Sequence, residues 1–105
     1  MAKGYWIGRI DVSDPEAYKA YIEANAEAFA KYGARFVVRG GEFTSMEGSA
    51  RQRNVVIEFD SYETALACYR SPEYARALAL RLPVATGDLI VVEGYDGPQP
   101  VDQGK

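Results

Sequence analysis

The stretch RNVVIEFDSY, residues 53–62, decides the fold of this chain. Its β-branched and aromatic residues, Val55 to Ile57 and Phe59, favour a largely buried strand. Asp60 or Ser61 then supplies a side-chain oxygen that can cap the start of a helix. Residues 10–17, IDVSDPEA, repeat this order of strand, acidic residue and helix start. The sequence therefore indicates two copies of one strand-helix-strand unit.

Two such units predict an α+β fold, a ferredoxin-like βαββαβ sandwich with two helices on one face of an antiparallel sheet. Proline at the first helical position and a glycine cap place the first helix between Pro15 and Gly33. A second proline, Pro72, is expected to break the second helix. We expect one domain over residues 1–96 and a loose tail over 97–105. The expected strands are 4–12, 35–39, 53–59 and 88–94, with a long arm or loop over 42–52.

Composition excludes several classes of protein and site. The chain has 105 residues, 48% of them apolar, and a net charge of -3, which argues against nucleic-acid binding. It lacks an apolar run long enough for a membrane span and a leader, so we expect a cytoplasmic protein. With no histidine and one cysteine, we expect no metal and no cofactor. Cys68 is either a small core residue or, as the alternative, a redox-sensing thiol.

The first helix carries an apolar stripe at three- and four-residue spacing that includes Tyr18 and Phe29. Asn25 lies in the middle of this stripe, and a buried carboxamide without hydrogen bonds costs about 1–3 kcal/mol. Two interpretations stay open: Asn25 is a satisfied core amide, or it points into a pocket between sheet and helices. The residues that could line such a pocket are Trp6, Tyr18, Asn25, Tyr69, Arg70, Tyr74 and Arg81.

The face of the sheet turned away from the helices is predicted to be half apolar. Alternation along the strands assigns Phe36, Val38, Val55, Ile57, Phe59, Ile90 and Val92 to the helix side. An uncovered sheet face should be mostly polar, so a contiguous apolar patch indicates an interface. We therefore expect a homodimer of two sheets packed face to face. Its predicted contact residues are Tyr5, Ile7, Arg9, Val37, Arg39, Val56, Glu58, Leu89 and Val91, beside Asn54 and Glu93.

Seven short motifs together resemble the domain of unknown function 1330 family. They are KGYWI (3–7), DPEAY (14–18), YGARF (32–36), RGG (39–41), RNVVIEF (53–59), YRSPEY (69–74) and VEGY (92–95). The resemblance spans Gly4 to about Tyr95 and implies a ferredoxin-like fold of the dimeric alpha-beta barrel superfamily. It implies no agreed reaction.

Function stays open between three hypotheses. The first is a homodimer that binds a small molecule in the pocket. The second is a cofactor-free enzyme, of monooxygenase or isomerase type, acting on a small aromatic or carbonyl metabolite. In that enzyme Asn25 would polarise an oxygen, Tyr69 or Tyr74 would donate a proton, and Arg70 or Arg81 would hold an acidic group. The third is a non-catalytic dimer that binds a partner protein.

Overall fold

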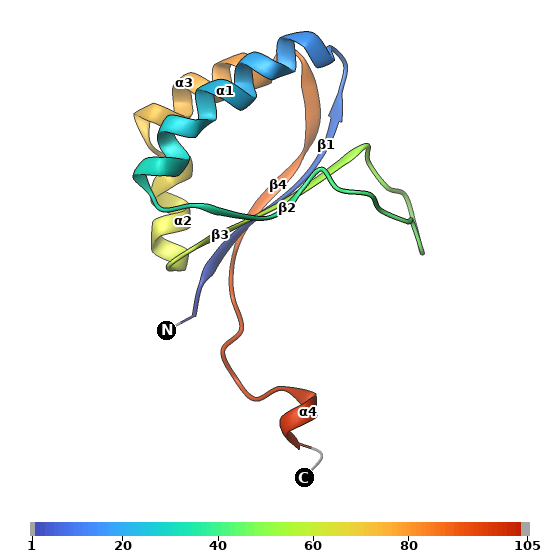
Figure 1. Ribbon diagram of the computed structural model, residues 1–105, viewed down its shortest axis with the longest axis vertical. Coiled ribbons are helices and arrows are strands. Elements are labelled where there is room, and N and C mark those ends of the chain that lie inside the picture. The colour runs from blue at the N-terminus through green and yellow to red at the C-terminus, as the bar shows by residue number, and fades with distance from the viewer. Residues whose placement is uncertain (1, 104–105) are drawn as a thin grey trace.

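The computed structural model describes residues 2–103. Strands and helices follow one another in the order expected for a ferredoxin-like sandwich, which confirms the α+β prediction (Figure 1). The elements are β1 (Gly4–Val12), α1 (Pro15–Lys31), β2 (Arg35–Arg39), β3 (Arg53–Phe59), α2 (Tyr62–Tyr69), α3 (Pro72–Arg81), β4 (Ala85–Glu93) and α4 (Pro100–Gln103).

The four strands form one antiparallel sheet in the order β2-β3-β1-β4. Helices α1, α2 and α3 lie on one side of this sheet, and α4 lies apart from them on the chain that follows β4 (Figure 1). Residues 40–52 leave the sheet as an arm, and the chain after β4 extends from the opposite end of the body (Figure 1). No helix within residues 2–103 is both long and apolar enough to cross a lipid bilayer.

The helix starts are set by side-chain caps, as the sequence predicts. Asp14 accepts a hydrogen bond from the amide of Ala17 at 3.1 Å, with Pro15 at the first helical position. Ser61 caps α2 and Ser71 caps α3 in the same way, so the second helix is broken as expected. After β4, residues 100–103 form a single helical turn, and the looseness of residues 97–105 stays a prediction.

Trp6 is the centre of the core between sheet and helices. It is 1% exposed, and its indole nitrogen donates a hydrogen bond to the carbonyl of Ala65 at 2.8 Å. Phe29 and Tyr74 meet its ring at centroid distances of 5.3 and 4.9 Å. Cys68 is fully buried beside this cluster, and burial raises the pKa of its thiol to about 12. A thiol with so high a pKa is unreactive at neutral pH, which favours the core interpretation over a redox sensor.

A β-bulge in β2 changes the predicted faces of that strand. Phe36 pairs with Ile57, but the next pair along is Val38 with Val56, so Val37 is an extra residue. The bulge moves Val38 to the uncovered face and Arg39 to the helix face, the reverse of the prediction for both. Arg39 is therefore not on the predicted dimer face.

The predicted faces of β4 are wrong by one position. The strand begins at Ala85 and not at residue 88, and it pairs Leu89 with Gly8 and Val91 with Trp6. Since paired residues share a face, Leu89 and Val91 face the helices, and Ile90 and Val92 face away. Glu93 pairs with Gly4, which pairs with Phe59 on the helix side, so Glu93 is also on the helix side and not on the predicted outer face.

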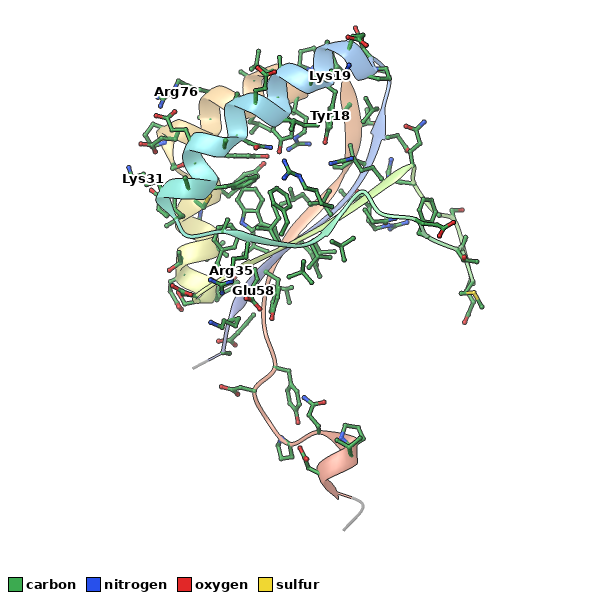
Figure 2. The ribbon with its side chains drawn as sticks, viewed as in Figure 1. Tyr18, Lys19, Lys31, Arg35, Glu58 and Arg76 are labelled. Atoms are coloured by element: carbon green, nitrogen blue, oxygen red, sulfur yellow. The ribbon has the colours of Figure 1, made fainter. Side chains whose placement is uncertain are left out.

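With these corrections, the uncovered face still carries an apolar row across all four strands. Val38, Val56, Ile7 and Ile90 are neighbours through successive pairs, and Val38 and Ile90 are 38% and 55% exposed. In the adjacent row, Glu58 accepts hydrogen bonds from Arg35 at 2.7 Å and from the hydroxyl of Tyr5 at 3.0 Å (Figure 2). Arg9 is on the same face and donates to the carbonyl of Ser49. The result is an exposed apolar strip with a polar margin.

Stability should depend on pH through the ion pair that joins the end of α1 to the start of α3. Lys31 Nζ lies 2.9 Å from Glu73 Oε2 (Lys31 is labelled in Figure 2), and this hydrogen bond lowers the pKa of Glu73. A lowered carboxylate pKa stabilises the fold above the unfolded-state value of about 4.3, and this stabilisation is lost as pH falls through the lower folded-state value. We expect Glu73→Gln to lower the melting temperature at pH 7, and the difference from the unaltered protein to shrink as pH falls below about 4.

Glu63→Gln is the matched control for this measurement. Glu63 and Glu73 occupy the same position in the first turn of α2 and α3, so both substitutions remove the same favourable interaction with the helix dipole. Only Glu73 has a lysine partner within residues 2–103. Equal losses of melting temperature at pH 7 for the two variants would contradict the role assigned to the ion pair.

Candidate ligand-binding site

A cavity lies between the sheet and helices α1 and α3. Its volume is about 40 Å³ for the centres of water molecules, several times the roughly 10–15 Å³ that one buried water requires. The sheet forms its floor, and side chains of α1 and α3 form its roof. The residues that line it are Trp6, Gly8, Ile10, Tyr18, Tyr21, Ile22, Asn25, Phe29, Phe36, Arg39, Arg53, Val55, Ile57, Arg81 and Leu89.

Gly8 opens the floor of the cavity. It lies in the middle of β1, in the row formed by Arg39, Val55, Gly8 and Leu89 across the sheet. A Cβ atom at Gly8 would lie at ordinary van der Waals distance from Leu89 and Ile10, with nothing closer than 3.8 Å, so a methyl group fits at this position. A glycine inside a strand often marks a place where a ligand approaches the backbone closely.

One end of the cavity is aromatic and apolar. Trp6 and Ile57 come from the row of the sheet next to Gly8, and Phe36 completes that row at the edge. Phe29 descends from α1 and meets the rings of Trp6 and Phe36 at centroid distances of 5.3 and 5.6 Å. This end provides an apolar surface for the body of a ligand.

Three arginines line the rest of the cavity. Arg39 and Arg53 come from the sheet, and Arg81 comes from the last turn of α3 and is only 7% exposed. Within residues 2–103, none of the three forms an ion pair, and no carboxylate is among the lining residues. The Nε atoms of Arg53 and Arg81 are buried without any hydrogen-bond partner in that part of the chain. The cavity is therefore electropositive.

Asn25 is 5% exposed and lines the cavity from the middle of α1. No hydrogen bond joins its carboxamide to another group of residues 2–103. The sequence left two interpretations of Asn25 open, a satisfied core amide or a residue that points into a pocket. The position of Asn25 in the cavity lining agrees with the second. Asn25 can both donate and accept hydrogen bonds to a molecule in the cavity.

Tyr18, Tyr21 and Tyr74 place their hydroxyl groups in or beside the cavity. The hydroxyls of Tyr21 and Tyr74 are 2.8 Å apart, and Arg81 Nη2 donates to Tyr74 at 3.5 Å. Burial raises the pKa of Tyr74 far above its ordinary value, and burial likewise raises the pKa of Tyr18. Tyr18 projects inward from the first turn of α1 (Figure 2). Neither phenol can act as a general base near pH 7.

The family of the chain follows from its match to a known model. Residues 3–95 match the model of the domain of unknown function DUF1330. The chain belongs to the DUF1330 family. No curated protein matches the sequence of this DUF1330 chain.

Solved structures with the same fold include both uncharacterised proteins and an oxygenase. A protein of unknown function from Rhodopseudomonas palustris has a TM-score of 0.72 at 18% identity, covering 91% of this chain and 85% of its own. SnoaB, a cofactor-independent oxygenase from Streptomyces nogalater, has a TM-score of 0.60 at 12% identity, and the match covers 98% of this chain and 100% of SnoaB. A dimeric ferredoxin-like protein of unknown function from Thermobifida fusca has a TM-score of 0.58 at 19% identity, and the match covers 88% of this chain and 89% of that protein. At these identities the likeness shows the fold alone.

The structure brings together four of the seven pocket residues predicted for this DUF1330 chain. Trp6, Tyr18, Asn25 and Arg81 line the cavity. Tyr74 lies behind the lining, beneath Tyr21, and Tyr69 packs on the rings of Trp6 and Tyr74. Arg70 ends α2 with an exposed side chain. None of these three residues lines the cavity.

Sequence reasoning missed three lining residues that matter for the chemistry. Arg53 opens the quoted strand and shares a face with Val55, so the alternation already indicated its side. Gly8 was recognisable as the small residue on the helix-facing side of β1. Arg39 could not be recognised from the sequence as a lining residue, because the bulge at Val37 moves its side chain to the opposite face of β2.

Proposed function

We propose that this chain binds a small organic molecule in the cavity between the sheet and the helices. The observation that carries the proposal is the space above Gly8, bordered by aromatic residues and by two arginines whose buried Nε atoms have no hydrogen-bond partner within residues 2–103. An empty space in a core destabilises the fold by the contacts it forfeits. Unpartnered polar groups beside it add a further unfavourable contribution. A ligand that fills the space and bonds to those groups removes both.

A cofactor-free enzyme is the alternative that the comparisons raise. The fold is shared with a cofactor-independent oxygenase, but fold alone does not carry activity across. A cofactor-free oxygenase or isomerase that works by removing a proton from its substrate needs a base with a suitable pKa. The lining residues include no carboxylate, and burial raises the pKa of Tyr18 in the lining and of Tyr74 behind it. The geometry therefore supports binding better than proton abstraction.

We also propose that two copies associate through the uncovered face of the sheet. Support comes from the exposed apolar row of Val38, Val56, Ile7 and Ile90. The arm adds exposed apolar groups, with Met46 84% exposed and Phe43 also exposed, that a second copy would cover. A structural neighbour is described as dimeric. A purely protein-binding dimer would use the same face but would have no need of the cavity.

Filling the cavity should abolish ligand binding while the fold is retained. The single tryptophan of the chain lines the cavity, so a bound aromatic molecule should change its fluorescence. We expect at least one member of a set of small aromatic acids, amides and alcohols to change Trp6 emission saturably, and Gly8→Val to lose the effect. A ligand at a hundred times its dissociation constant should also add about 2.7 kcal/mol to the free energy of unfolding.

Gly41→Val is the matched control for that experiment. Gly41 is exposed in the arm, has no atom within 4 Å of its Cβ position, and has no positive φ angle. The Gly41→Val variant should bind the same molecules as the unaltered protein. Unchanged binding by Gly8→Val, or no response to any of these molecules by the unaltered protein, would rule out the cavity as the binding site.

A charge placed in the apolar row should separate the dimer. Ile7 is in the centre of the row, and Ile7→Asp would bury an unpaired carboxylate in the proposed interface, which is strongly unfavourable. We expect the mass from light scattering to fall from that of two chains to that of one. Leu80→Asp serves as control, since Leu80 is exposed on α3 and faces away from the sheet. A monomeric mass for the unaltered protein at micromolar concentration would refute the dimer.

A further inference from the structure

The geometry points to a small organic monocarboxylate as the ligand of this cavity, with its carboxylate on Arg81 and its compact apolar body against Trp6 and Phe29. The inference rests on the proposed binding function and names the chemical class of the ligand. It follows from how the chain distributes its arginines and from which donors stay unused.

Arg81 is the decisive residue. Its guanidinium is withdrawn from solvent in the last turn of α3, and the desolvation of an unpaired cation is strongly unfavourable. Within residues 2–103 its polar contact is one long hydrogen bond, from Nη2 to the hydroxyl of Tyr74 at 3.5 Å, and the ring of Tyr21 lies 5.5 Å away. Nε has no partner. A guanidinium has five N–H donors in a planar fork that matches a carboxylate.

Three of the five arginines outside the cavity pair with a carboxylate, whereas Arg9 and Arg70 form no ion pair within residues 2–103. Arg35, Arg51 and Arg76 each lie within 3.2 Å of a carboxylate of this chain, although their more exposed positions make such pairs less necessary. The chain has 15 acidic residues and a net charge of -3, so acidic partners are plentiful. That the most buried arginine lacks one indicates that its anion comes from outside the chain.

A second arginine extends the site. Arg53 Nε is also buried without a partner, and its guanidinium lies 5.8 Å from the ring of Tyr18. Gly40, with a φ angle of 67°, provides room for that guanidinium beside the backbone of the arm. Arg53 pairs with Ile10, four residues along the sheet from the pair of Trp6 and Ile57. Arg53 is therefore separated from the aromatic end along the cavity, as the two ends of an aromatic acid are, whereas the Arg39 guanidinium lies 4.0 Å from the ring of Phe36.

The direct test compares benzoate with benzamide, which has nearly the same shape and no charge. Titration calorimetry and Trp6 fluorescence would measure both dissociation constants for the unaltered protein. We expect benzoate to bind at least tenfold more tightly than benzamide. Arg81→Gln should weaken benzoate about 10- to 100-fold, the loss of one charge-assisted hydrogen bond, and should leave benzamide within a few-fold of its original value.

Arg76→Gln is the matched control, because Arg76 is on the same helix, is exposed, and pairs with Glu27 outside the cavity. It should bind benzoate as the unaltered protein does. Equal affinities for benzoate and benzamide, or an unchanged benzoate affinity in Arg81→Gln, would overturn the carboxylate assignment while leaving the binding site in place. If neither compound nor any other small aromatic molecule binds, the proposed function itself fails. The comparison of the two compounds needs no variant, so it holds even if Arg81→Gln does not fold.

Discussion

The indole of Trp6 is the contact on which the rest of the structure depends. It projects from β1, one of the two central strands, donates a hydrogen bond to the carbonyl of Ala65 in α2, and touches Phe29 of α1 and Tyr74 of α3. One side chain thereby joins the sheet to all three helices that cover it. Its N–H is satisfied inside the protein, so the ring can be fully buried without an unpaired donor.

The position of Trp6 also explains why a cavity exists two residues further along the strand. Trp6 and Gly8 face the same side of β1, so the largest residue type is followed on that face by the smallest. The indole holds the helices away from the sheet, and Gly8 contributes no side chain to fill the gap that follows. The packing that stabilises one end of the domain therefore creates an unfilled space beside it. That space is where the buried Nε atoms of Arg53 and Arg81 find no hydrogen-bond partner within the described residues.

The sequence was sufficient for the architecture and for half of the cavity. Helix caps at Asp14, Ser61 and Ser71 and the apolar stripe of α1 determine the elements, because their signals are local. Residues on β1 and β3 were assigned to the correct faces, since both strands alternate regularly. The Leu-Ile-Val-Val run of β4 is apolar at every position, so alternation cannot fix its register, and Leu89 and Val91 were assigned to the wrong side. The bulge at Val37 depends on pairing with β3 and leaves no mark in the sequence of β2.

The central claim is that the cavity above Gly8 holds a carboxylate against Arg81. The most direct measurement is a crystal structure of the protein with 4-bromobenzoate, in which anomalous scattering locates the bromine independently of the rest of the ligand. This account predicts a bromine peak at the aromatic end, beside Trp6 and Phe29, with the carboxylate within hydrogen-bond distance of Arg81. A bromine peak confined to the protein surface, or an acidic side chain from a second copy paired with Arg81 in the cavity, would contradict it.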